Sequence, residues 1–276
     1  MAALKVVNGQ VELACEVAGE GPAVVLLHGW PDSSALWRDV APRLVDAGYR
    51  VVVPDLRGCG RSSKPAEVAD YKMAHLVGDV LAIIDQVCGG RAHLVGHDLG
   101  SNLAWVTASY APDAVERLAA VSVGHPSSFR SAGIAQQVRS WYVLLFEHQG
   151  IAEEWLSRDD FAVFRQWLGH PDAAGVVDNI VASGSLSTHL NWYRATITAR
   201  IYVDPVPVLP AIHVPTLGIW SSGDLALTEV QMTGSAPYCD AGFAYERMEG
   251  LGHWIPLEDP EGLTGSLVAF FDQGPR

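Results

Sequence analysis

Residues 96–100 read Gly-His-Asp-Leu-Gly, the Gly-x-nucleophile-x-Gly pattern of a tight turn between a strand and a helix. Such a turn usually presents a serine, but this sequence has Asp98 at its centre. A carboxylate, with a reference pKa of about 3.9, is ionised at neutral pH and can attack carbon without a base. Attack on an ester carbonyl would give an unproductive mixed anhydride. Attack on a saturated carbon gives an ordinary ester, so Asp98 predicts a substrate with a strained or good leaving group, either an epoxide or a halide.

Two further residues could hydrolyse such an ester. His253 lies in the glycine-rich stretch "EGLGHWIPLEDP" and Asp224 lies in "WSSGDLAL", each just after a predicted strand. Asp224 would orient the imidazole and stabilise its charged form, while His253 would take a proton from the attacking water. Because a histidine must be neutral to accept this proton, activity is expected to have a lower pH limit near the reference pKa of about 6.5.

A mostly parallel sheet is predicted to position these groups. Continuous apolar runs ending in glycine or a polar residue are typical of strands buried on both faces. Such buried strands are predicted at 23–29 and 92–98, after a hairpin that turns at Asn8-Gly9. Further strands are predicted at 50–55, 117–123, 216–221 and 243–248. Helical segments are predicted at 33–47, 75–87, 99–111 and 260–271, with another between the last two strands. Strands that alternate with helices predict an α/β fold with a doubly wound sheet.

One long segment interrupts this alternation. Residues 127–210 read as helical, and these 84 residues contain 11 of the 24 aromatic residues of the chain. This segment is predicted to form a helical cap, or lid, over the strand ends, where open α/β sheets bind their ligands. The predicted domains are a core of residues 1–126 and 206–276 and a cap of residues 127–205. The proline-rich stretch "DPVPVLPAIHVP" is expected to be the stiff linker back to the core.

Taken together, these motifs resemble those of the epoxide hydrolases of the α/β-hydrolase fold, and the resemblance covers nearly the whole chain. His28, Gly29, Trp30 and Pro31 are similar to the H-G-x-P motif of that family. The stretch "DLRGCGRS" stands at the place of its D-x-R-G-x-G-x-S loop. The chain order of nucleophile, acid and histidine is also that of this fold. The resemblance implies an oxyanion hole made by the backbone N–H groups of Trp30 and Leu99, each worth about 3 kcal/mol in the transition state.

Two segments of the cap resemble the family more specifically. Tyr142 in "WYVLLFEHQGIAE" and Tyr193 in "LNWYR" stand in segments similar to those that carry its two epoxide-polarising tyrosines. A phenol with a pKa near 10 is protonated at neutral pH and can donate to the alkoxide that forms when an epoxide opens. The resemblance therefore implies hydrolysis of an apolar epoxide to a vicinal diol, with an upper pH limit near 10 where tyrosine ionises.

Two other functions stay open at this point. A haloalkane-type dehalogenase would use the same nucleophile, but such enzymes commonly place Trp after the nucleophile and Asn or Glu after the His-Gly pair. Here those positions hold Leu99 and Trp30, and a departing halide needs weak N–H donors rather than a phenol. A non-catalytic ligand-binding protein of the same fold would keep the pocket without the chemistry. Diol formation from styrene oxide, halide release from a bromoalkane, or neither, would distinguish the three.

Composition limits the partners. The chain has 276 residues, 49% of them hydrophobic, and a formal net charge of −13. This charge disfavours nucleic acid and anionic membranes as partners, because both attract basic surfaces. No apolar run reaches the roughly 20 residues that span a bilayer, and the first ten residues lack the apolar core of a signal peptide, so a cytoplasmic location is expected. No metal or organic cofactor is implied. The expected partner is a small-molecule epoxide, and the exposed aromatic content of the cap suggests a homodimer.

Overall fold

The computed structural model describes residues 1–206 and 208–273. Within these residues, eight strands form one sheet in the order β1-β2-β4-β3-β5-β6-β7-β8. The strands are β1 (Ala2–Asn8), β2 (Val11–Ala18), β3 (Ala23–Leu27), β4 (Arg50–Pro54), β5 (Ala92–His97), β6 (Val115–Val121), β7 (Thr216–Ser221) and β8 (Phe243–Met248). β2 runs antiparallel to both of its neighbours, and all other adjacent strands are parallel.

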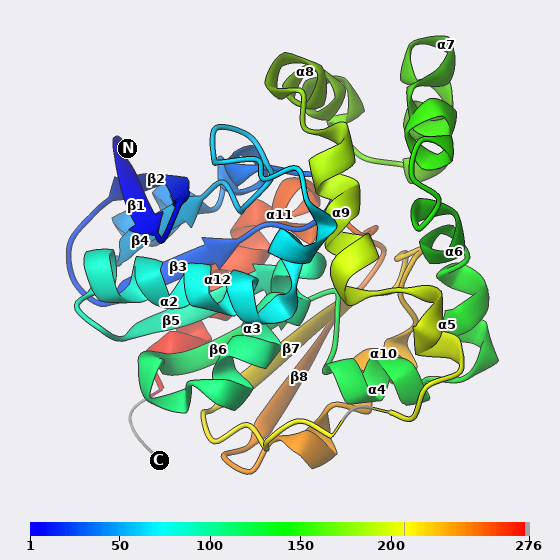
Figure 1. Cartoon of the computed structure of the whole chain (residues 1–276). Helices are drawn as coiled ribbons and strands as arrows, with labels where there is room; N and C mark the ends of the chain where they lie inside the picture. The colour runs from blue at the N-terminus through cyan, green and yellow to red at the C-terminus, as the bar shows by residue number, and fades with distance from the viewer. Residues whose placement is uncertain (207, 274–276) are drawn as a thin grey trace.

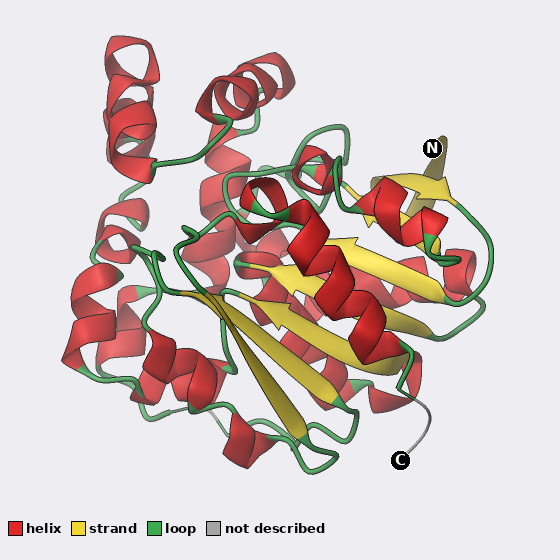
Figure 2. Cartoon of the chain, turned by 180° about the vertical axis from the view of Figure 1, so that it is seen from behind, coloured by secondary structure: helices red, strands yellow, loops and turns green. Residues whose placement is uncertain are grey.

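Helices cover both faces of this sheet, as Figures 1 and 2 show from opposite sides. Successive side chains of a strand point to opposite faces of the sheet. Val25 and Leu27 of β3 therefore join the core beneath α2 (Met73–Cys88) and α3 (Leu99–Tyr110), while Val24 and Leu26 join the core beneath α1 (Ala41–Asp46) and α12 (Pro260–Phe271). The helices are α1 (Ala41–Asp46), α2 (Met73–Cys88), α3 (Leu99–Tyr110), α4 (Pro126–Ser131), α5 (Ile134–Arg139), α6 (Tyr142–Phe146), α7 (Ile151–Leu168), α8 (Ala173–Ser183), α9 (Leu186–Thr196), α10 (Glu229–Thr233), α11 (Ile255–Glu258) and α12 (Pro260–Phe271). The predicted doubly wound α/β fold is confirmed.

The predicted helix at 33–47 is wrong as a single element. A short 3-10 helix spans Ser34–Trp37, and α1 begins only at Ala41. Pro42 lies in the first turn of α1, where its missing N–H costs nothing. The same missing N–H and the proline ring would break a helix that continued from Trp37.

The inserted helices α4 to α9 lie between β6 and β7 in the chain, as predicted for a cap. Figure 1 shows α6 to α9 grouped at one end of the sheet. Side chains of α9 contact core loops there: Thr188 donates to the Gly58 carbonyl at 2.6 Å, and the Trp192 indole donates to the Arg57 carbonyl at 2.8 Å. The cap is therefore fixed to the core by buried polar contacts.

The predicted linker includes residue 207, which lies outside the described residues. Its other residues form no helix or strand, apart from a single bridge between Ile212 and Cys239. Across 1–206 and 208–273, no helix combines the length and the apolar character needed to cross a membrane.

Candidate active site

Asp98 lies at the sharp turn between β5 and α3, with φ of 53° and ψ of −120°. A positive φ is unfavourable for a residue other than glycine and is typical of residues that a fold holds in place for function. The two glycines of the motif make the turn possible. A Cβ on Gly96 would collide with the Gly100 carbonyl, and a Cβ on Gly100 would collide with the Leu27 carbonyl. Only glycine fits at positions 96 and 100, because backbone segments pass very close to each other at this turn.

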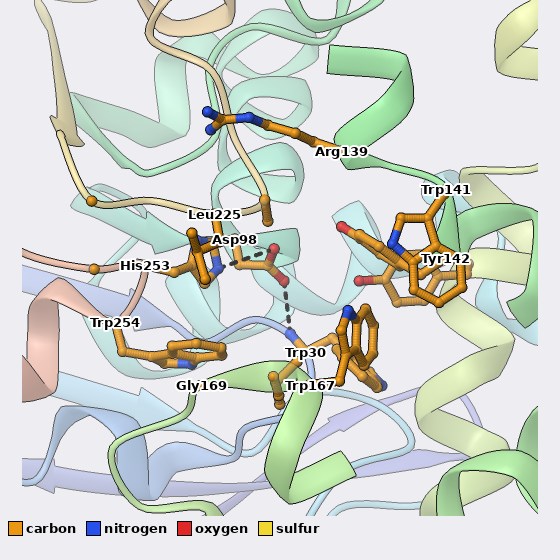
Figure 3. Close-up of a pocket in the computed structure, with 15 residues that line it drawn as sticks. Trp30, Asp98, Arg139, Trp141, Tyr142, Trp167, Gly169, Leu225, His253 and Trp254 are labelled. Atoms are coloured by element: carbon orange, nitrogen blue, oxygen red, sulfur yellow. Dashed lines mark hydrogen bonds and ion pairs between the residues drawn. The ribbon is translucent and has the colours of Figure 1, made fainter. Parts of the chain in front are cut away.

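The structure brings together the three residues predicted to act as nucleophile, base and acid. His253 Nδ1 lies 2.7 Å from Asp224 Oδ2, and His253 Nε2 lies 3.6 Å from Asp98 Oδ2. All three side chains are buried. Asp224 is itself held because its other oxygen accepts the backbone N–H groups of Ala226 and Leu227 at 2.8 and 2.9 Å. Figure 3 shows the imidazole and the Asp98 carboxylate facing each other.

These contacts shift the pKa values of two members of the site. Burial disfavours a charged His253, but the carboxylates of Asp224 and Asp98 outweigh it and raise the pKa of His253 to about 10. Burial likewise opposes ionisation of Asp98, but His253 and the Trp30 N–H hold the pKa of this carboxyl below its usual range. This raised pKa favours a protonated His253 in the resting protein. The expected lower pH limit of activity concerns the ester form, in which Asp98 carries no charge, and it stays a prediction.

The backbone of the His253 loop is fixed from both sides. Its carbonyl lies 2.9 Å from His97 Nε2 and accepts the Ser122 hydroxyl at 3.1 Å. On either side of the histidine, the N–H groups of Gly252 and Trp254 donate to the Glu258 carboxylate at 2.6 and 3.1 Å. These supports act on backbone atoms, which is why the sequence reading did not find them. The one feature of the sequence that could have indicated this support is an acidic residue, Glu258, five positions after His253.

Of the two predicted oxyanion-hole groups, the Trp30 N–H donates to Asp98 Oδ1 at 2.9 Å. The Leu99 N–H is the first of α3, and within the described ranges no group accepts a hydrogen bond from it. One N–H thus holds the carboxylate in the resting protein, and the other is free for an oxygen that changes position during a reaction. The N-terminus of α3 also favours negative charge at this point.

The other residues of the H-G-x-P motif shape the loop. The imidazole of His28 accepts the Leu56 N–H through Nε2 at 3.0 Å, and its Nδ1 lies 2.9 Å from the Gly29 carbonyl. A Cβ on Gly29 would collide with the Cβ of Asp98. The peptide bond between Trp30 and Pro31 is cis. The close approach of Gly29 to Asp98 places the Trp30 N–H within hydrogen-bonding distance of the Asp98 carboxylate.

Asp32, which follows this motif, was missed by the sequence reading. Its buried carboxylate accepts the Trp254 indole N–H at 3.1 Å and lies 3.1 Å from Nε2 of His170, in the loop after α7. The Trp254 ring packs edge-on against His253, with centroids 4.9 Å apart. Asp32 thus connects the cap to the wall of the site.

Tyr142 begins α6 and Tyr193 lies in α9, with ring centroids 6.0 Å apart and planes at 83°. Figure 3 shows Tyr142 across the cavity from His253, with Asp98 between them. Burial, reinforced by the negative charge of Asp98, raises the pKa of both phenols above the usual value. On this basis, an upper pH limit set by tyrosine ionisation is expected above 10 rather than near it.

Asp98 and the two tyrosines lie where two cavities meet. The larger, of about 210 Å³, has aromatic walls and also contains His253; the smaller, of about 120 Å³, has mostly aliphatic walls. The aromatic walls are Trp30, Trp141, Trp167 and Trp254, and the aliphatic walls include Leu99, Val123, Val143, Ile197, Ile201 and Leu227. Such a site accepts an apolar molecule and presents a carboxylate, an imidazole and two phenols to it. Among the residues that the structure describes, no three side chains of metal-binding type gather into a metal site.

Fold and site together define a hydrolase of the α/β class, and the comparisons agree. The chain belongs to the alpha/beta hydrolase fold family, whose family model matches residues 22–260. It is 30% identical to epoxide hydrolase A of Mycobacterium tuberculosis, over 95% of this chain and 94% of the relative. It is also 30% identical to the AB hydrolase superfamily protein YfhM of Bacillus subtilis, over 90% of this chain and 89% of the relative.

A solved structure of an epoxide hydrolase from metagenomes of hot environments superposes with a TM-score of 0.87 at 26% identity, covering 99% of each chain. The predicted resemblance to epoxide hydrolases of this fold is therefore confirmed.

Proposed function

We propose that this protein is an epoxide hydrolase that converts an apolar epoxide and water into a vicinal diol through an ester on Asp98. One observation carries the proposal. The carboxylate at the strained turn faces both the His253 imidazole and an apolar cavity that also presents Tyr142 and Tyr193. The two buried phenols beside the carboxylate fit an epoxide substrate, because ring opening needs a donor that protonates the ring oxygen. We propose further that residues 127–205 form the cap and that residues 1–126 and 206–276 form the core.

In the first step, Oδ2 of Asp98 attacks one carbon of the epoxide ring. Oδ1 accepts the Trp30 N–H, so Oδ2 is the oxygen free to form the new bond. The bond from that carbon to the ring oxygen breaks, and the oxygen takes a proton from Tyr142 or Tyr193. Both phenols are protonated at neutral pH, because the ordinary pKa of tyrosine is near 10 and burial raises it further. Each therefore holds a proton that it can give to the ring oxygen.

In the second step, water hydrolyses the ester. Alkylation removes the negative charge of Asp98, which is one of the two charges that raise the pKa of His253. His253 then loses its proton more readily while the tyrosinate regains one, so the proton count of the intermediate is unchanged. Neutral His253 takes a proton from water, which attacks Cγ of the ester. The N–H groups of Trp30 and Leu99 hold the resulting oxyanion. As it collapses, the bond from Cγ to the substrate oxygen breaks, and that oxygen takes the proton of the new hydroxyl on Cγ. The diol leaves, Asp98 is again a carboxylate and His253 is protonated, as at the start.

One turnover in ¹⁸O-labelled water tests this proposal. With enzyme in excess over styrene oxide, the first diol should contain unlabelled oxygen, because its new oxygen comes from Asp98. The label should appear in the protein, in the peptide that contains Asp98, and in the diol only in later turnovers. Label in the first diol would mean that water attacks the epoxide directly and would refute the ester mechanism.

The pKa shifts predict different pH profiles for the two kinetic parameters. kcat includes ester hydrolysis and should fall as pH is lowered, because protonated His253 cannot accept a proton from water. kcat/KM reports the free enzyme up to alkylation and should persist to lower pH, because the pKa of Asp98 is held below its usual range. Neither should fall near pH 10 through tyrosine ionisation. Steady-state rates on styrene oxide between pH 4 and 10 check this, and a kcat that stays flat down to pH 4 would contradict His253 as the base.

One observation favours dehalogenation as a second candidate function. The buried indole Nε1 of Trp30, which lines the larger cavity, has no hydrogen-bond partner among the described residues. A departing halide accepts such N–H donors, so Trp30 could stabilise it. The paired phenols favour the epoxide, because a halide needs no proton. Halide release from a bromoalkane without diol formation from styrene oxide would favour the second candidate.

A further inference from the structure

Arg139, the last residue of α5, is the basic side chain that lines the larger cavity besides His253. Its Nη1 donates to the backbone carbonyls of Asp224 and Leu227, both at 2.7 Å. The guanidinium is thus fixed at the rim of the cavity by a single nitrogen. Figure 3 shows it above Leu225, on the same side of the site as His253.

The other edge of this guanidinium is unused. Arginine has five N–H donors, and Nη1 uses its two, which leaves Nε and Nη2 with three. Within 1–206 and 208–273, no group accepts a hydrogen bond from these three, and no carboxylate forms an ion pair with Arg139. The residue as a whole is exposed. The Nε and Nη2 edge is one that pairs with a carboxylate through two parallel hydrogen bonds.

The surroundings show why such a pairing would matter. The chain has a net charge of −13, which repels an anionic substrate, and the Asp98 carboxylate adds to this within the cavity. Two arginines with buried side chains, Arg57 and Arg194, pair with the carboxylates of Asp79 and Glu153. Arg139 lines the same cavity as four tryptophans and forms no ion pair with a carboxylate of the described residues.

We propose that Arg139 binds a carboxylate of the substrate, remote from the epoxide ring, so that the larger cavity selects aryl epoxides with an acidic substituent. This inference rests on the proposed epoxide hydrolase function and names a substrate class for it. A tether that only holds the Asp224 loop is the simpler role for Arg139. The two roles differ in one respect: the tether affects all substrates equally, and the carboxylate pairing affects only anionic ones.

The test compares 4-(oxiran-2-yl)benzoate with 4-(oxiran-2-yl)benzamide, which has nearly the same shape and no charge. Arg139→Gln should lower kcat/KM for the benzoate about tenfold more than for the benzamide, mainly through KM, the scale of one charge-assisted hydrogen-bonded pair. Arg139→Lys, which keeps the charge without the fork, should restore part of the difference. Added salt should reduce the preference of the wild type for the benzoate.

Arg91→Gln is the matched control. Arg91 pairs with Glu116 at 3.0 Å just before β5, so it lies about 20 Å, the length of that strand, from Asp98. Arg91→Gln removes the same charge from the protein as Arg139→Gln does. It should leave the ratio of kcat/KM for the benzoate to kcat/KM for the benzamide unchanged.

If Arg139→Gln lowers kcat/KM equally for both substrates, Arg139 only holds the Asp224 loop and the inference is overturned. A wild-type enzyme that turns over the benzamide but not the benzoate would also overturn it. Failure of the proposed function is a separate result, because then the wild type would form no diol even from styrene oxide.

Discussion

His253→Gln should stop the reaction after its first chemical step. Asp98 remains ionised and placed, because its Oδ1 still accepts the Trp30 N–H, so the carboxylate can still open an epoxide. Glutamine cannot take a proton from water, and loss of a general base typically costs 10²–10⁴-fold. The ester should therefore accumulate while turnover falls by about 10³-fold. Intact-protein mass spectrometry with styrene oxide should show an adduct of the mass of one substrate molecule.

Asp98→Ala is the matched control for this variant. It should abolish turnover and form no adduct, alone or combined with His253→Gln, because the attacking oxygen is gone. Peptide mapping should place the adduct of His253→Gln on the peptide that contains Asp98. If His253→Gln demonstrably binds the epoxide but forms no adduct, the two-step mechanism is wrong.

The sheet and the arrangement of Asp98, Asp224 and His253 could be predicted from the sequence for one physical reason. Asp98 and Asp224 follow the buried strands β5 and β7, and His253 follows β8 at the edge of the sheet. The carboxyl ends of parallel strands meet at one edge of the sheet. Apolar runs locate the strands, so residues far apart in the chain can be placed together. The glycines around Asp98 add to this, since no other residue fits where the backbone segments nearly touch.

What the sequence could not predict depends on distance and on backbone atoms. The raised pKa of His253 arises because two carboxylates flank one buried ring, and no pattern reports that separation. Glu258 and Arg139 act on backbone N–H and carbonyl groups, which every residue has, so neither leaves a motif. Pro42 is a different case, because the break that it imposes on the helix could have been predicted from its missing N–H.

Substitution of the two cap tyrosines should distinguish most clearly between an epoxide and a halide substrate. Tyr142 and Tyr193 both line each of the two cavities that meet at Asp98, and burial keeps both protonated. If each can donate to the opening ring, Tyr142→Phe or Tyr193→Phe alone should slow alkylation about tenfold, because the other phenol still donates. Removing both leaves the alkoxide without an acid, and alkylation should fall by 10²–10⁴-fold.

Single-turnover measurement of ester formation, in the His253→Gln background, isolates this step from hydrolysis. Tyr202→Phe is the matched control, because its hydroxyl donates to the Ser140 carbonyl at 2.8 Å, and Tyr202 lines neither of the two cavities that meet at Asp98. It should leave alkylation unchanged. Full-rate ester formation without both phenols would mean that the leaving group needs no proton. Asp98 would then be better matched to a halide, with the Trp30 indole, whose Nε1 has no partner in the described part of the chain, as the donor to that halide.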